Sequence, residues 1–346
     1  MSRWCSIVPA VFPLLLVAAC VDVEPELGAT EQLQSCPKSW GCGENSPVIG
    51  PWNFHELNQD HRPNAEGVTL LGLWKNDVPY QVEVKGAQMF AKHLDGTVLS
   101  GAQLDGSYLV VTTADGNKAK IHIVKVSPQA TSQTTFWVGP PTRIETYELE
   151  YQLDDGDYTP LCNNPPGRES YEGPGRLYAR PLEAILFTGD RYDATAKKVT
   201  ETGRATAGWF NIACASSAIA KLELTRHTEH GKLAAYPSDR GTRQAMLKMY
   251  TSDLCGRGAT FTAKGTPLHW QNTLGWSVLT GAEYAHEAYW NQDGAVCLDT
   301  HRRFTEYLPE IAAECADAGH PLPTCAGTTI PPGSYLSSAV PFATLP

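Results

Sequence analysis

The sequence predicts an α+β fold, made mostly of antiparallel β-hairpins with two or three helices and stabilised by disulfides. Runs of β-branched and aromatic residues are separated by Asp-Gly turns, which is typical of hairpins. Apolar residues recur at helical spacing in only two or three stretches. Cysteines are spread through a chain that begins with the features of an export signal, and this combination indicates disulfides.

Residues 1–19 have the features of a secretory signal peptide, because Arg3 is followed by an apolar run too short to span a bilayer as a helix. The run ends in Val17-Ala18-Ala19-Cys20, which resembles a bacterial lipobox. The resemblance implies that Cys20 carries palmitate-type acyl chains and begins the mature chain, and several chains anchor stably. The alternative is an ordinary cleavage site beside a chance cysteine. Val21, in place of Asp, favours the outer membrane of a Gram-negative bacterium.

The segment after the signal indicates a lipid-anchored tether over residues 20–46. Val21 to Ser35 is acidic and lacks aromatic residues, as solvated linkers do. The formal net charge of the chain is −10. Because nucleic-acid phosphates require a basic surface, we expect no nucleic-acid partner. The expected partners are the membrane, through the N-terminal lipid, and an unknown envelope protein or glycan ligand.

The cysteine count predicts a disulfide framework. The chain has 10 cysteines. Cys5 leaves with the signal and Cys20 takes lipid, which leaves an even set of Cys36, Cys42, Cys162, Cys214, Cys255, Cys297, Cys315 and Cys325. The absence of any C-x-x-C pair disfavours a zinc site. Proximity suggests the pairs Cys36–Cys42 and Cys315–Cys325. For the central four we favour Cys162–Cys214 and Cys255–Cys297, and the two other pairings stay open.

Residues 47–128 are expected to form an N-terminal β module. Leucines recur every five residues at Leu94, Leu99, Leu104 and Leu109. This period resembles pentapeptide repeats, which stack into a β-solenoid, but the run would make only about one coil and stacked repeats need neighbours. We therefore prefer an ordinary hairpin with Asp-Gly turns. The runs Ser107 to Thr113 and Lys118 to Val126 flank Asp115-Gly116 and predict a second hairpin.

Residues 142–304 are expected to form a second domain. Its strands are predicted by β-rich runs at Thr142 to Gln152, Tyr158 to Cys162, Leu182 to Thr188 and Trp209 to Cys214. Asp154-Asp155-Gly156-Asp157 between the first two is interpreted as a turn, because it lacks the spaced carboxylates of an EF-hand. Two further hairpins are predicted at Thr260 to Trp270 and Tyr284 to Leu298.

Three helices are predicted, at Ala215 to Thr225, Asp239 to Thr251 and Glu306 to Ala318. Asp239 is a suitable N-cap for the second. The third belongs to a C-terminal helix and tail over residues 305–346. Gly327 to Pro346 shows no period, and we expect it to be a loosely attached tail.

Several motifs from Cys162 to Cys297 resemble the ADYC domain, a bacterial domain of uncharacterised function found in exported lipoproteins. Its Ala-Asp-Tyr-Cys signature corresponds here to Ser252-Asp253-Leu254-Cys255, in which Asp253 and Cys255 match. The matching flanks are P-L-C at Cys162, W-F-N-I-A-C at Cys214, A-I-A-K at Lys221, G-T-P at Gly265 and D-G-A-V-C at Cys297. The resemblance supplies no activity or catalytic residues.

Two positions depart from this family pattern together. The family carries a cysteine after A-I-A-K and another in a helix of the form Q-A-C-x-R-M, whereas this chain has Leu222 and Met246 there. Replacement of one disulfide by other contacts would remove both of its cysteines together, as is seen here. We therefore expect Leu222 and Met246 to pack against each other as an apolar substitute.

The motifs of the common hydrolases, nucleotide-binding proteins and zinc proteases are absent from the sequence. His227 and His230 could hold a metal with Asp239 or His301, but an exposed helix end is the simpler interpretation. Asp253 could be catalytic, although an aspartate beside a half-cystine more often bonds backbone amides. We expect no catalytic residue, metal or cofactor, and a noncatalytic cell-envelope binding or structural protein. The alternatives are an envelope hydrolase with its site near Asp253, His227 and His230, and a secreted toxin or predation factor.

Overall fold

The computed structural model of the chain describes residues 47–49, 52–130, 143–154, 156–162, 183–215, 217–231, 238–261, 268–273, 277–278, 284–299, 308–325 and 330–341. The expected signal, Cys20 and the Cys36–Cys42 pair lie outside these residues. The described chain is mostly antiparallel β-sheet with three α-helices and three disulfides.

The largest element is an antiparallel sheet of 11 strands. In spatial order it consists of β3 (Glu56–Asn58), β15 (Trp209–Cys214), β12 (Ala184–Phe187), β10 (Thr146–Leu153), β9 (Lys118–Ser127), β8 (Tyr108–Thr112), β4 (Thr69–Lys75), β5 (Val78–Lys85), β6 (Gln88–Lys92) and β7 (Val98–Ser100), with β11 (Thr159–Pro160) paired to β10. A small hairpin, β1 (Val48–Ile49) and β2 (Trp52–Asn53), precedes it. Strands from both predicted modules thus lie in one sheet.

The leucine pentads form hairpins, as preferred from the sequence. Asp95 and Gly96 make the turn between β6 and β7, and a short 3-10 helix, η3 (Gly101–Leu104), leads into β8. Leu94 is fully exposed at the turn whereas Leu104 and Leu109 are fully buried. The leucines therefore do not stack as a solenoid would require.

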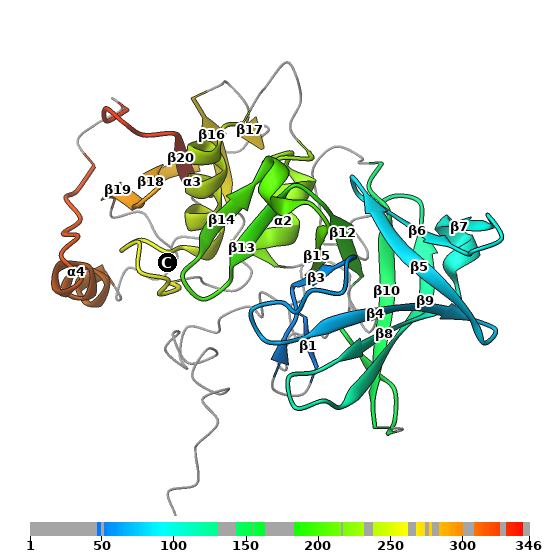
Figure 1. The fold of residues 1–346 in the computed structure, drawn as a ribbon. Helices are drawn as coiled ribbons and strands as arrows, with labels where there is room; N and C mark the ends of the chain where they lie inside the picture. Colours follow the sequence, from blue (N-terminus) through cyan, green and yellow to red (C-terminus); the bar gives the residue numbers. More distant parts are fainter. Residues whose placement is uncertain are drawn as a thin grey trace, which may run out of the picture.

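The sheet is curled (Figure 1). Two side chains accept backbone amides from strands that are not their neighbours in the sheet. The Val84 N–H donates to Oε1 of Gln59, just after β3, over 3.0 Å. The Met89 N–H donates to the Tyr147 hydroxyl, also over 3.0 Å. These bonds satisfy amides that no strand pairs with, because buried backbone donors need partners. The curled sheet encloses a core of alternate residues from nearly every strand.

The strands β12 and β15 are buried on both faces. Leu186 and Ile212 face the core of the curled sheet, whereas Ile185 and Phe187 face a second core. The second core is formed with the helices α2 (Ala218–Leu224) and α3 (Arg240–Thr251). These two strands therefore belong to both halves of the molecule.

The second half surrounds α3, which runs between a hairpin and a smaller sheet (Figure 1). The hairpin is β13 (Asp190–Asp193) with β14 (Lys198–Thr202), followed by a 3-10 helix, η5 (Gly203–Thr206). The sheet has the order β17 (Ser277–Val278), β16 (His269–Asn272), β20 (Leu336–Pro341), β18 (Tyr284–Asn291) and β19 (Gly294–Leu298). A third helix, α4 (Leu308–Asp317), lies beyond it.

The predicted helices are confirmed, and side-chain caps explain where two of them begin. The Ser217 hydroxyl accepts the Ala220 N–H over 3.1 Å at the start of α2. Asp239 accepts the Thr242 N–H over 2.7 Å at the start of α3, as predicted. The predicted hairpin at Tyr284 to Leu298 is confirmed as β18 and β19. For the hairpin expected at Thr260 to Trp270, the tip lies outside the described residues, and β16 pairs with β17 and β20.

The expectation of a loosely attached C-terminal tail is wrong. Residues Leu336–Pro341 form β20, which lies between β16 and β18 and has Leu336 and Val340 buried. The sequence shows no regular alternation of apolar residues here, because the position between Leu336 and Val340 on the buried face is the polar Ser338. Its hydroxyl donates to Glu287 Oε2 and accepts from Trp290 Nε1, each over 2.9 Å, so a polar side chain fits the core.

One of the disulfides is the pair that we favoured, Cys162–Cys214. The expected pairs Cys255–Cys297 and Cys315–Cys325 are wrong, because Cys255 bonds to Cys315 and Cys297 bonds to Cys325. The chain after α4 returns alongside β19, where the Leu298 N–H donates to the Pro323 carbonyl over 3.0 Å. That contact places Cys325 beside Cys297, although Cys315 is nearer than Cys297 to Cys325 in sequence.

Candidate functional site

The signature tetrad lies where α3 ends. Ser252 has a left-handed backbone (φ 49°) and caps the helix. The Asp253 N–H then donates to the Lys248 carbonyl over 2.9 Å, which turns the chain back under the helix. This reversal buries Asp253 completely.

Asp253 is held by a buried ion pair. Its Oδ2 contacts Lys248 Nζ and accepts the Gly258 N–H over 2.8 Å. The Lys248 ammonium also donates to the Ala196 carbonyl, over 3.1 Å, and to the Gly256 carbonyl, over 3.3 Å. A buried charge requires such a partner and further hydrogen bonds. The expectation that Asp253 bonds local backbone amides is confirmed by the Gly258 contact.

The loop from Ser252 to Gly258, here termed the signature loop, packs against the turn between β18 and β19. The Ala295 N–H donates to the Leu254 carbonyl over 3.0 Å. Gly256 has a φ of +74°, and a Cβ there would collide with the carbonyl oxygen of Asp293. Gly294 has a φ of +134°, and its Cβ would lie 2.7 Å from the Leu254 oxygen. Two glycines therefore permit the two turns to approach backbone to backbone.

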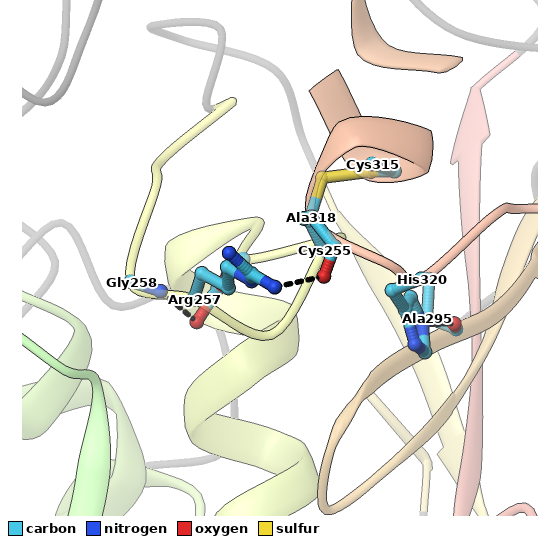
Figure 2. Close-up of a disulfide and its surroundings, with 8 residues drawn as sticks. Cys255, Arg257, Gly258, Ala295, Cys315, Ala318 and His320 are labelled. Atoms are coloured by element: carbon cyan, nitrogen blue, oxygen red, sulfur yellow. Dashed lines mark hydrogen bonds between the residues drawn. A yellow bond between two sulfur atoms is a disulfide. The ribbon is translucent and has the colours of Figure 1, made fainter. Parts of the chain in front are cut away.

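The signature loop also holds α4 (Figure 2). Cys255 forms its disulfide with Cys315 on α4, and the Arg257 guanidinium donates to the Ala318 carbonyl beyond the helix. His320 Nε2 lies 2.8 Å from the Ala295 carbonyl on β19. Within α4 itself only Ile311 and Cys315 are buried. The signature loop thus joins α3, the hairpin turns and α4.

A second set of charges is buried at the other end of α3. Arg243 makes ion pairs of 3.1 Å with Asp190 Oδ2 and 3.0 Å with Glu229 Oε2, and donates to the Ser238 carbonyl over 2.7 Å. Burial raises the pKa of Asp190, and the Arg243 guanidinium opposes that rise. These contacts join α3 to β13 and to the loop after α2.

His227 lies in the core, which contradicts the expectation of an exposed helix end. Its Nδ1 lies 2.7 Å from the Thr225 carbonyl and its Nε2 lies 3.2 Å from Asn272 Nδ2, while the ring packs edge-on against Trp270. Burial lowers the pKa of His227 to about 4. The ring is therefore neutral at pH 7, donates its Nδ1 proton to Thr225 and accepts from Asn272.

His230 has a different partner from His227. Its Nδ1 lies 3.0 Å from Oε1 of the fully buried Glu223, whose other oxygen accepts from the Thr228 hydroxyl. Asp253, His227 and His230 thus bond to three separate sets of groups. Among the described residues no cluster of three or more metal-ligating side chains occurs, and His301 lies outside them.

Sequence reasoning singled out Asp253 but missed its partner Lys248. The sequence offered no local signal, because Lys248 lies on the opposite side of the helix from Met246 and Tyr250, and only the structure shows that both sides of α3 are buried.

A model of the ADYC domain family matches residues 101–304. The chain belongs to the ADYC domain family. No curated protein and no solved structure matches the chain. The matched range includes the signature loop, the helices α2 and α3, and the strands β12 and β15 that the two cores share. In the part of the chain that is described, no helix is long and apolar enough to cross a bilayer.

Proposed function

We propose that this ADYC domain protein is a noncatalytic binding or structural component of the cell envelope, anchored by lipid on Cys20 to the outer membrane of a Gram-negative bacterium. The observation that carries the proposal is the role of the signature aspartate. Asp253 is fully buried, paired with Lys248 and bonded to the Gly258 amide. A carboxylate that is buried and paired in this way stabilises the packing around it and has no access to a substrate. The three disulfides support an oxidising compartment.

The anchor is tested by membrane fractionation of cells that express the full chain. The wild-type chain should sediment with the outer membrane, and Cys20→Ser should move to the soluble fraction because it cannot be acylated. Recovery of Cys20→Ser in the membrane fraction would contradict the lipid anchor.

The noncatalytic role is tested by incubating the full chain with purified envelope polymers, including peptidoglycan. Retention on a polymer without release of soluble fragments is the expected result. Asp253→Asn is compared with Asp317→Asn, which changes an exposed aspartate on α4. Fragments released by the wild-type chain and by Asp317→Asn, but not by a folded Asp253→Asn, would show that Asp253 is catalytic and would refute the proposal.

A further inference from the structure

Four ring side chains form a row on one face of the large sheet, across β4, β8 and β9. Strand register places Trp74 opposite Tyr108, and Tyr108 opposite His122. The Trp74 and Tyr108 rings are nearly parallel, at 10° and with centroids 6.4 Å apart. The Tyr158 ring, from the chain before β11, has its centroid 5.5 Å from that of His122. We call these four residues the ring row.

The ring row lies on the outer face of the sheet, because its neighbours along each strand face the core. Leu73, Leu109 and Ile121 are fully buried. Successive residues of a strand point to opposite faces, so the ring beside each of them points outward. Tyr158 is 46% exposed, and the other three rings are half-buried. A ligand can therefore reach the row from solvent.

The polar atoms of these rings are open to a ligand. Within the described part of the chain, the Trp74 indole N–H and the Tyr108 and Tyr158 hydroxyls have no hydrogen-bond partner. The Tyr147 hydroxyl, by contrast, is used on both sides, by the Met89 amide and by a carboxylate. A ring that combines an apolar body with an unpaired polar tip can both pack against a ligand and bond to it.

Glu150 extends the row on β10, where it stands opposite His122. Its Oε2 lies 3.8 Å from His122 Nδ1, which is longer than a hydrogen bond, and its side chain is 32% exposed. An ionised carboxylate has two oxygens and only accepts hydrogen bonds. Glu150 can therefore accept from hydroxyl groups of a ligand that lies along the rings.

The charges around the row are mixed in sign. An open hollow of about 220 Å³ lies beside it, two residues further along β8, and is lined by Val110, Lys118, Lys120, Gln152 and Asp154. Lys120 already interacts within the protein. Glu150 in the row and the exposed Asp157 before Tyr158 add two carboxylates to that of Asp154. Because amines and carboxylates stand this close together, a charged ligand meets repulsion as well as attraction, which favours a neutral one.

The position and size of this surface restrict the kind of ligand further. The strands β4, β8 and β9 are each hydrogen-bonded on both sides within the sheet, so a peptide cannot bind there by adding a strand. Strand spacings and the Tyr158 contact give the row a length of about 15 Å. A stable protein interface buries about 800 Å² of each partner around an apolar centre, and a single row edged by charges is too small for that.

A neutral oligosaccharide has the chemistry that this surface can recognise. The C–H bonds on the face of a sugar ring are partly positive and are attracted to electron-rich aromatic rings. The hydroxyl groups on its edge donate to carboxylates and exchange hydrogen bonds with indole and phenol groups. Sugars are repeated along the chain of an oligosaccharide, as the rings are repeated along the row.

We propose that the ring row and Glu150 bind a neutral oligosaccharide. Its sugar rings pack against Trp74, Tyr108 and Tyr158, and its hydroxyl groups donate to the Glu150 carboxylate. This inference rests on the proposed binding function and names the class of ligand.

The test is isothermal titration calorimetry of the full chain at pH 6 with hexasaccharides of different charge. Cellohexaose and chitohexaose are neutral, hexagalacturonate is anionic, and chitosan hexaose is the cationic counterpart of chitohexaose. We expect a neutral hexasaccharide to bind more tightly than both charged ones. Tyr158→Ala and Glu150→Ala should each weaken that binding about tenfold. Leu94→Ala and Asp317→Asn, which change exposed residues on other surfaces, should leave it unchanged.

Equal binding of hexagalacturonate or of chitosan hexaose would overturn the assignment of a neutral ligand. No binding of either neutral hexasaccharide at millimolar concentration, or equal losses in the control variants, would overturn the inference. These outcomes are distinct from failure of the proposed function, which would appear as release of fragments from envelope polymers.

Discussion

At the scale of single residues, Lys248 and Asp253 form a buried ion pair that holds the end of α3 to the signature loop. Both side chains are almost inaccessible to solvent, and each charge has the other as its main partner. Such pairs contribute little net stability compared with apolar residues, but removal of one partner leaves an uncompensated charge in the core. The energetic importance of the pair should therefore appear in single substitutions.

Lys248→Met keeps most of the side-chain volume and removes the amine. We expect it to lower the free energy of unfolding by about 3–5 kcal/mol, because Asp253 stays buried without its partner. Urea unfolding with disulfides intact measures this. Lys248→Arg, the residue in the family's helix pattern, and the exposed Lys198→Met are the controls. A further change of Asp253 to Leu should recover much of the loss, and a loss below about 1 kcal/mol in Lys248→Met would contradict the prediction.

His227 should make stability depend on pH. The folded protein binds a proton to this ring only below its pKa of about 4, whereas the unfolded chain binds one below about 6.5. The unfolded state therefore holds more protons between these values, and stability falls as pH drops from 6.5 to 4. The shift corresponds to about 3 kcal/mol. His227→Phe should remove this part of the pH dependence of urea unfolding, whereas His93→Gln, at a surface turn, should retain it.

The sequence allowed Asp253 to be identified at this scale but not the geometry around it. The resemblance to the ADYC signature drew attention to the aspartate, and local chemistry predicted a backbone partner, which is Gly258. Lys248 was missed because the partnership depends on the left-handed Ser252, which reverses the chain under the helix. His227 was misplaced because its burial depends on β16, which supplies Trp270 and Asn272 from a distant part of the chain.

At the scale of elements, α2 and α3 form a packed pair. Leu222 and Met246 are both fully buried and belong to the same core cluster. They occupy the two positions where the family pattern has cysteines. Direct contact between the two side chains stays a prediction, and cysteine substitution offers a way to test it.

The double variant Leu222→Cys, Met246→Cys should form a disulfide during oxidative folding. We expect non-reducing mass spectrometry to show loss of two hydrogens and a peptide that links α2 to α3. Disulfide geometry requires the two Cα atoms to lie within about 7 Å, so the bond reports proximity. Leu222→Cys with Met249→Cys serves as the control. Free thiols in both double variants would contradict the expected contact.

Hairpins and helices were the elements best predicted from the sequence, because turn residues and caps are local signals. The Asp-Gly turns and the Asp239 cap marked boundaries close to those found. The strand β20 was missed because Ser338 is satisfied by Glu287 and Trp290, residues that no local pattern connects to it.

At the scale of the whole molecule, β12 and β15 connect the two cores. Every residue of both strands is buried, and their side chains alternate between the cores. The chain cannot lose one core without exposing a face of these strands. We therefore expect the two halves to unfold together.

Phe187→Ala should destabilise both halves, although its side chain faces only the core around the helices. Truncation of a fully buried phenylalanine costs about 3–5 kcal/mol. Hydrogen exchange in denaturant should show the same loss of protection at the β8–β9 amides as at the α3 amides. Leu94→Ala, at an exposed turn, should change neither. Loss of protection confined to α3 would show that the halves unfold independently.

The connectivity of the disulfides has a consequence for biogenesis. Cys162 and Cys214 are consecutive, but the bonds Cys255–Cys315 and Cys297–Cys325 interleave along the chain. If the chain is exported from its N-terminus, as the proposed lipid anchor requires, Cys255 and Cys297 reach the oxidants before Cys315 emerges, and a bond between them would be non-native. Only thiol–disulfide exchange can correct it, and uncatalysed reshuffling takes up to hours. On that route, we expect efficient maturation to depend on a disulfide isomerase, because an oxidase alone would accumulate a trapped isomer.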